Sequence, residues 1–163
     1  MKKSWILGVL AVVVVLVAGG AVKKYLDKLS AGGGAARQAA EVPRIARGTA
    51  SAAEVNEALR KRAENINRRA PIRVDKNTRL DASEAGDRRF RYHYTVITAS
   101  AEDKDWKKIW RRFRVVLRNR VCTSEDLRWL LANGVTFDYI YRGKNGKHVG
   151  TITVTPGQCG VEG

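Results

Sequence analysis

The sequence contains few of the residues that build metal sites and catalytic centres. Its 163 residues include only two histidines and two cysteines. His93 and His148 are too few and too scattered for a metal site, which needs several ligands at fixed spacing. The cysteines do not form a Cys-X-X-Cys pair, the arrangement that thiol oxidoreductases use. We therefore predict no metal, no cofactor and no catalytic residue, and we expect that the protein is not an enzyme.

Other catalytic signatures are missing as well. The chain has no glycine-rich phosphate loop, no glycine-flanked nucleophile and no Ser-His-Asp context. Acidic residues near the expected early strands are Asp75, Asp81, Glu84 and Asp87. Catalysis by paired carboxylates requires a shared cleft and separated pKa values. Nothing in the pattern indicates either, so solvation of turns and strand ends explains these residues better.

One long apolar run, from Trp5 to Val22, follows a basic flank at residues 1–4. Ten of the positions from Ile6 to Val17 are Val, Leu or Ile, and the run contains no charge. Its 18 residues would span about 27 Å as a helix, close to the hydrocarbon thickness of a bilayer. A core helix would show polar residues at helical spacing. We predict a transmembrane segment or signal anchor at residues 5–22.

Cleavage and orientation of this segment stay open. The small residues 18–21 fit a signal-peptide cleavage site, whereas the length of the run and the Lys23-Lys24-Tyr25 that follows favour an uncleaved anchor. Positive charges flank both ends, so the charge rule does not decide the orientation. A basic start before an apolar run is the usual export signal, which favours a domain outside the cytoplasm. Residues 23–50, rich in Gly and Ala, are predicted to be a flexible linker.

Residues 51–163 form one predicted soluble domain. Ser51 and Glu54 fit a capping box at the start of a helix that ends by Pro71. Strands and helices that cluster instead of alternating are typical of an α+β domain, and we predict a mostly antiparallel sheet with helices on one face. Extended segments are expected at 72–74, 78–81 and 89–98, helices at 103–121 and 124–132, and a hairpin from 135–142 and 149–155.

The helix at 103–121 is expected to be strongly amphipathic. Its apolar residues recur at i, i+3, i+4, i+7, i+10, i+11 and i+15, which predicts a continuous inward stripe. The stripe consists of Trp106, Ile109, Trp110, Phe113, Val116, Leu117 and Val121. The predicted outward face is basic and consists of Lys107, Lys108, Arg111, Arg112, Arg114 and Arg118.

Positive charge dominates the whole chain, whose formal net charge is +15. From Ser51 onward, 23 Lys and Arg oppose 14 Asp and Glu, which leaves +9 on the domain. Such a balance attracts nucleic acid, anionic lipid or an acidic protein face. The basic helix face is therefore either an anion-binding surface or a solvated face without a dedicated partner, and the sequence leaves both open.

Cys122 and Cys159 lie at the end of this helix and just past the last expected strand. In an oxidising compartment they would form a disulfide, and in a reducing one they would be two separate buried thiols. The bond would stabilise the domain by about 3–4 kcal/mol in the chain-entropy model. It would also pin the last strand to the long helix.

Several segments of the chain form a recognisable pattern. They are Asp75-Lys76-Asn77-Thr78-Arg79-Leu80-Asp81, Val121-Cys122-Thr123, Leu130 with Leu131, Asn133-Gly134-Val135-Thr136, Tyr139-Ile140-Tyr141-Arg142-Gly143-Lys144-Asn145-Gly146-Lys147, and Ile152-Thr153-Val154-Thr155-Pro156 before Cys159. Together they resemble a family of small bacterial exported or membrane-anchored proteins of unknown function. The resemblance spans residues 58 to 159 and implies bacterial origin and export, which favours the disulfide; it implies no activity.

More distantly, the order of elements with two flanking cysteines is similar to pilotins. These small periplasmic chaperones guide secretins to the outer membrane. Pilotins are lipoproteins, and this chain lacks the lipid-bearing cysteine. No binding residue is therefore carried over from them.

These observations favour a non-enzymatic, membrane-tethered interaction module of the bacterial envelope. It would cross the inner membrane once through residues 5–22, with its domain in the periplasm and an envelope protein or anionic lipid as partner. The alternative is a basic domain facing the cytoplasm that binds nucleic acid or anionic lipid. Nucleic acid is the weaker choice, because the sequence shows no recognition helix, RNP-type aromatic pair or zinc module.

Overall fold

The computed structural model describes residues 44–103 and 106–161. The predicted membrane segment 5–22 and residues 23–43 of the predicted linker lie outside the described residues. Within the described ranges, no helix combines the length and the apolar character needed to cross a bilayer.

The elements follow the predicted succession of one helix, three strands, two helices and two strands. Strand β2 is longer than expected, since it continues to the turn before β3. In chain order the elements are α2 (Ala52–Asn67), β1 (Ile72–Arg73), β2 (Thr78–Gly86), β3 (Arg89–Val96), α3 (Trp106–Cys122), α4 (Glu125–Ala132), β4 (Thr136–Gly143), β5 (His148–Val154) and the 3-10 helix η1 (Gly157–Cys159).

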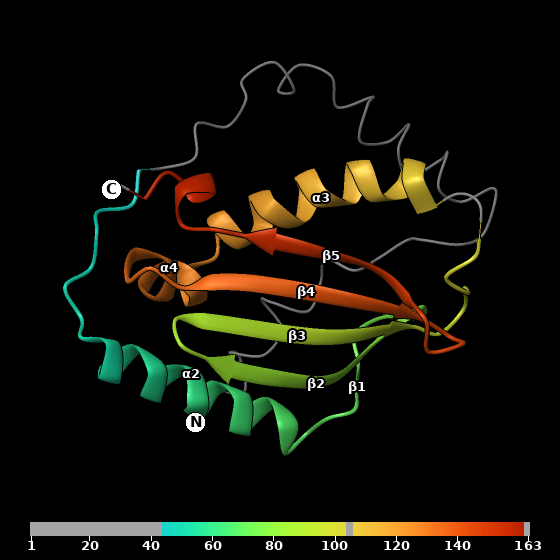
Figure 1. The fold of residues 1–163 in the computed structure, drawn as a ribbon, viewed down its shortest axis with the longest axis horizontal. Helices are drawn as coiled ribbons and strands as arrows, with labels where there is room; N and C mark the ends of the chain where they lie inside the picture. The colour runs from blue at the N-terminus through green and yellow to red at the C-terminus, as the bar shows by residue number, and fades with distance from the viewer. Residues whose placement is uncertain (1–43, 104–105, 162–163) are drawn as a thin grey trace.

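The five strands form one sheet in the order β1-β2-β3-β4-β5. Three of the neighbouring pairs are antiparallel and β3–β4 is parallel, with α3 and α4 in the connection between them. The prediction of an α+β domain with a mostly antiparallel sheet is confirmed. Figure 1 shows α2 alongside β2 and α3 alongside β5, so that β5, the long edge strand, lies next to the basic helix.

Alternation along β3 and β4 places the core on one face of the sheet. The burial of β3 alternates between exposed or half-buried and buried positions, with Tyr92 and Tyr94 inward. Parallel pairing sets these two opposite Tyr139 and Tyr141, and each pair of rings stacks with centroids 5.0 Å apart. Burial raises the pKa of Tyr94, Tyr139 and Tyr141, so these phenols stay neutral. The tyrosine stack is core.

Helix α2 begins with the predicted capping box. The Glu54 N–H donates to Ser51 Oγ at 3.2 Å, and the Ser51 N–H donates to Glu54 Oε2 at 2.8 Å. The helix covers the β2–β3 side of the core with Val55, Leu59 and Ala63, which are all buried. These three residues form the inward face of the helix.

Residues 44–50, which composition assigns to the linker, pack against the domain. Ile45 is 4% exposed, and its N–H donates to the Gly160 carbonyl at 3.2 Å. The Gly48 N–H donates to the Ala132 carbonyl at 2.8 Å. The packed domain therefore starts earlier than composition indicates, because one bulky apolar side chain in a Gly- and Ala-rich context reaches the core.

Helix α3 is held against the sheet at two points. Trp110 lies on the backbone of β5, where a Cβ at Gly150 would stand 2.6 Å from the indole Cζ2. The Trp110 ring also meets Tyr141 edge-on, with centroids 5.5 Å apart. At the other end of α3, a disulfide joins Cys122 to Cys159 in η1, directly after β5.

Gly150→Ala is expected to destabilise the protein by about 1–3 kcal/mol, because the added Cβ overlaps the indole of Trp110 and forces α3 away from β5. The matched control is Gly157→Ala, whose Cβ meets nothing within 4 Å. Urea unfolding of the full-length chain measures both. Equal stability of the two variants would contradict the close contact.

Replacing both cysteines (Cys122→Ser with Cys159→Ser) is expected to lower the free energy of unfolding by about 3–4 kcal/mol, since the bond constrains the unfolded chain. Reducing agent should produce the same loss in the parent protein and none in the double variant. If reducing agent left the urea midpoint of the parent protein unchanged, the disulfide would not be formed.

Candidate anion-binding groove

Helix α3 carries seven basic residues and no acidic one between Trp106 and Cys122. The six that the sequence assigns to its outward face, Lys107, Lys108, Arg111, Arg112, Arg114 and Arg118, are all exposed. Within the described ranges, none of these six forms an ion pair or a side-chain hydrogen bond. Like charges one turn apart destabilise a helix by about 0.2–0.5 kcal/mol per pair. The basic face therefore costs α3 stability.

Four of the six basic residues line a groove of about 530 Å³ between α3 and β5. They are spaced i, i+4, i+7 and i+11, which makes one straight row along the helix. We call Lys107, Arg111, Arg114 and Arg118 the cationic row. Lys108 and Arg112 do not line the groove, so the structure divides the predicted face into a row of four and two outliers.

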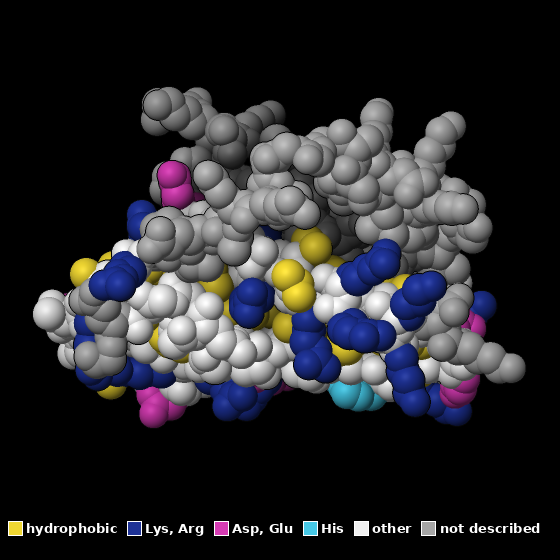
Figure 2. All heavy atoms as spheres, turned by 90° about the horizontal axis from the view of Figure 1, so that it is seen from above, with side chains coloured by type: hydrophobic (Ala, Val, Ile, Leu, Met, Phe, Trp, Pro, Cys, Tyr) yellow, Lys and Arg dark blue, Asp and Glu magenta, His cyan; other side chains and the backbone are white. Residues whose placement is uncertain are grey.

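The rest of the groove is apolar or uncharged. Trp110 and Val115 contribute from α3, Ile152 and Thr153 from β5, and Gln158 from η1. Figure 2 looks onto this side of the molecule and shows Lys and Arg side chains gathered around exposed hydrophobic atoms. Cations next to apolar surface favour a ligand that has both negative charge and apolar groups.

The exposure of Val116 shows that the predicted inward stripe of α3 is wrong at this position. Val116 is 53% exposed, and its neighbour Val115 is 51% exposed. Trp106, Leu117 and Val121 are buried as predicted. Because α3 runs along the edge of the sheet and not over its middle, only a narrow side of the helix finds a partner there. Val116 lies at the margin of that side and reaches solvent.

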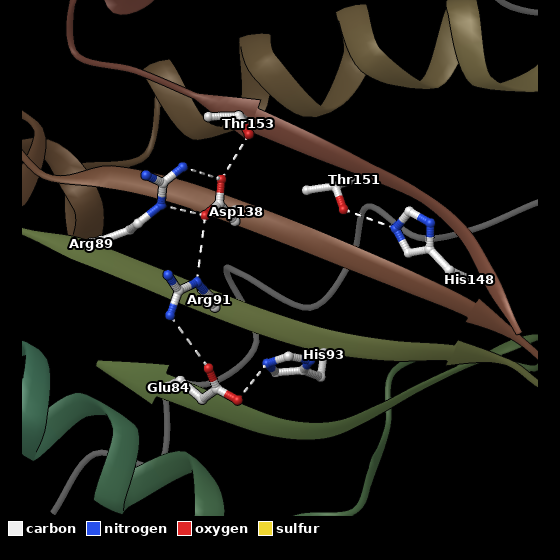
Figure 3. Close-up of polar contacts among 8 residues, drawn as sticks. All are labelled: Glu84, Arg89, Arg91, His93, Asp138, His148, Thr151 and Thr153. Carbon is white, nitrogen blue, oxygen red and sulfur yellow. Dashed lines mark hydrogen bonds and ion pairs between the residues drawn. The ribbon is translucent and has the colours of Figure 1, made fainter. Parts of the chain in front are cut away.

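The open face of the sheet carries a second charged cluster, centred on Asp138 in β4 (Figure 3). Arg89 donates to Asp138 through Nε at 2.6 Å and Nη2 at 3.3 Å, and Thr153 Oγ1 donates at 2.7 Å. Arg91 Nε stands 3.8 Å away. Burial acts to raise the pKa of Asp138, but these hydrogen bonds and cationic charges outweigh it and hold the pKa below its usual value.

The two histidines lie apart from the groove. His93 Nε2 is 3.0 Å from Glu84 Oε1 on the open sheet face, and His148 Nε2 is 3.0 Å from Thr151 Oγ1 on β5. Within the described residues, no group of three or more His, Cys, Asp or Glu is arranged to hold a metal ion. Both histidines have a polar neighbour on a solvent-facing surface.

Sequence reasoning missed the β5 wall of the groove and the buried carboxylate of Asp138. Ile152 and Thr153 line the same groove as α3, and no local pattern reports this nonlocal arrangement. One signal did exist: Gln158 precedes Cys159, and the expected bond from Cys159 to the end of α3 brings that segment next to the basic helix.

A domain family of unknown function, DUF8479, matches residues 54–150, more than half of the chain. The chain belongs to this family. The match covers α2 through the first part of β5 and includes the cationic row and Asp138. No curated protein matches the sequence.

Solved structures with the same fold include three bacterial proteins. One, from Pseudomonas aeruginosa and classed as a candidate secreted protein, has a TM-score of 0.58 and 21% identity, covering 68% of this chain and 99% of its own. The pilotin EpsS of the type 2 secretion system of Vibrio vulnificus has a TM-score of 0.55 and 13% identity, covering 66% and 94%. The pilotin AspS of Vibrio cholerae has a TM-score of 0.50 and 16% identity, with the same coverage. The predicted similarity to pilotins holds for the fold.

Asp138→Asn is expected to lower stability at neutral pH by about 1–2 kcal/mol, because it weakens the charged hydrogen bonds from Arg89. A lowered carboxyl pKa stabilises the fold above the unfolded-state pKa of about 3.9 and loses this effect as pH falls through the folded-state pKa. The deficit should therefore shrink between about pH 5 and pH 2. Glu84→Gln, with a side chain 55% exposed, serves as control. Urea unfolding at several pH values measures the stability deficit of Asp138→Asn. A deficit that does not change with pH would contradict the lowered pKa of Asp138.

Proposed function

We propose that this protein is a non-enzymatic interaction module of the bacterial envelope and that its partner binds at the groove beside the cationic row. The observation that carries the proposal is the row itself: four exposed cations along one line of α3, next to apolar surface and without acidic partners among the described residues. A solvated helix face would gain stability from mixed charges. A row of charges of one sign instead destabilises the helix by repulsion, but it attracts an anionic partner.

The disulfide and the fold support an extracytoplasmic place. Disulfides persist in the periplasm and outside the cell and are rare in the cytosol. Residues 5–22 would tether the chain to the inner membrane by a single pass, with the domain in the periplasm. The structural neighbours include a candidate secreted protein and two pilotins of type 2 secretion systems. An envelope protein is therefore favoured over nucleic acid as the partner.

Among the described residues, the lining of the groove contains no carboxylate and no histidine. His93 and Glu84 meet on the open face of the sheet and do not line the groove. The groove residues thus fit recognition better than chemistry.

Photo-crosslinking in living cells tests the proposal. A benzoylphenylalanine at Val115 of the full-length chain is expected to capture an envelope protein, and the reversal Arg111→Glu with Arg114→Glu should abolish the adduct because it changes the local charge by four units. The same crosslinker at Ala53, an exposed position of α2, should give no matching adduct. Lys76→Glu with Lys144→Glu, which removes the same charge from two other exposed positions, should leave the Val115 adduct intact.

Two results would contradict the proposal. One is a Val115 adduct no stronger than the Ala53 adduct. The other is capture of a cytoplasmic protein or nucleic acid, which would favour the alternative topology.

A further inference from the structure

No strand within residues 44–103 or 106–161 pairs with the outer edge of β5. β5 is the last strand of the sheet order, and among the described residues its seven positions have no backbone hydrogen bonds except those of the β4 ladder. The opposite edge, β1, has only two residues. Edge strands leave a row of free N–H and C=O groups that can pair with another chain. The long edge therefore offers a template for a sixth strand.

The groove runs along this edge. Ile152 and Thr153 are consecutive in β5, and both line it. A cavity lined by two consecutive residues of the edge strand runs along that strand. Gln158 of η1 bounds it at the end where β5 finishes.

The cationic row forms the facing wall and matches the strand in length. From Lys107 to Arg118 the row extends about 16 Å, at 1.5 Å per helical residue. The seven residues of β5 extend about 20 Å. A chain lying between them would meet backbone groups on one side and four positive charges on the other.

We propose that the groove takes an acidic polypeptide segment in extended form, which adds to β5 as a sixth strand and sets carboxylates at alternate positions against the cationic row. This inference rests on the proposed function and names the class and conformation of the partner. Main-chain pairing would supply affinity, and alternate side chains would supply selectivity. Val115, which is exposed, would contact apolar side chains between the acids.

Charge argues against occupants from this protein itself. Residues 1–43 contain six Lys and Arg and two Asp and Glu, so they do not complement the row. A second copy would bring a chain of net charge +15 to a basic surface. An acidic segment of another protein is the complementary occupant. The competing explanation is that the cations only guard the edge against aggregation, and it predicts that no peptide binds.

The test uses the full-length chain in zwitterionic detergent and fluorescent synthetic peptides with the length of β5. The first peptide alternates Val and Glu, the second alternates Val and Lys, and the third has the first sequence with every second backbone nitrogen methylated. Fluorescence anisotropy gives the affinity, and amide hydrogen exchange reports on residues 148–154. N-methylation removes main-chain donors while it keeps the charge, so it separates strand pairing from simple ionic attraction.

We expect the Val–Glu peptide to bind with an affinity that falls as salt rises and to slow exchange in 148–154. The Val–Lys peptide should not bind. Methylation should weaken binding by at least about tenfold, because several main-chain hydrogen bonds are lost. Arg111→Glu with Arg114→Glu should weaken binding to a similar degree, and Lys76→Glu with Lys144→Glu should leave it unchanged.

Equal binding of the methylated peptide would overturn strand addition and leave the envelope interaction intact. Absence of Val–Glu binding would also overturn it, and the Val115 crosslink in cells would then decide separately whether the groove has any partner. Absence of both the Val–Glu peptide binding and the Val115 crosslink would contradict strand addition and the proposed envelope interaction alike.

Discussion

The contact between Trp110 and the backbone of β5 at Gly150 determines where the basic helix stands. Because Gly150 has no side chain, the indole approaches the strand closely, and α3 lies along the edge of the sheet. The disulfide fixes the far end of the helix to the segment after β5. Held at these two attachments, α3 presents the cationic row to the edge strand.

Two features that are each energetically unfavourable therefore lie side by side in this fold. A helix with one sign of charge repels itself, and an edge strand exposes unpaired main-chain groups. Either feature alone is ordinary on a protein surface. Their alignment along one groove, with apolar surface between them, makes recognition of an anionic partner the simplest account of both. The open face of the sheet differs, because its arginines are already paired with Asp138 and Glu84.

Much of the fold follows from local patterns in the sequence. Alternation along Arg89–Val96 identifies the central strand and its buried face, and the Ser51–Glu54 capping box identifies the start of α2. Local patterns fail where the deciding contact is nonlocal. Val116 fits the apolar stripe of α3, yet it is exposed because the sheet edge accommodates only part of that stripe. Ile45 lies in a segment with linker composition, yet it is buried against the domain.

The candidate site shows the same division. The sequence identifies all six basic residues of α3, since their density is a local property. It does not show that four of them face β5, because that follows from the position of Trp110 on Gly150. The sequence also does not identify Asp138 as buried and ion-paired. The arginines that surround it belong to β3, the parallel neighbour of β4, and Arg89 is 49 residues away in the chain.

The groove between α3 and β5 should be occupied by a partner where the protein works. Amide hydrogen exchange of the full-length chain in native envelope vesicles, compared with the purified chain, measures this directly. Exchange at residues 106–118 and 148–154 should be slower in the vesicles than in the purified chain, and both segments should slow together. Unchanged exchange in both segments, or protection confined to β2 and the open face of the sheet, would contradict occupancy of the groove.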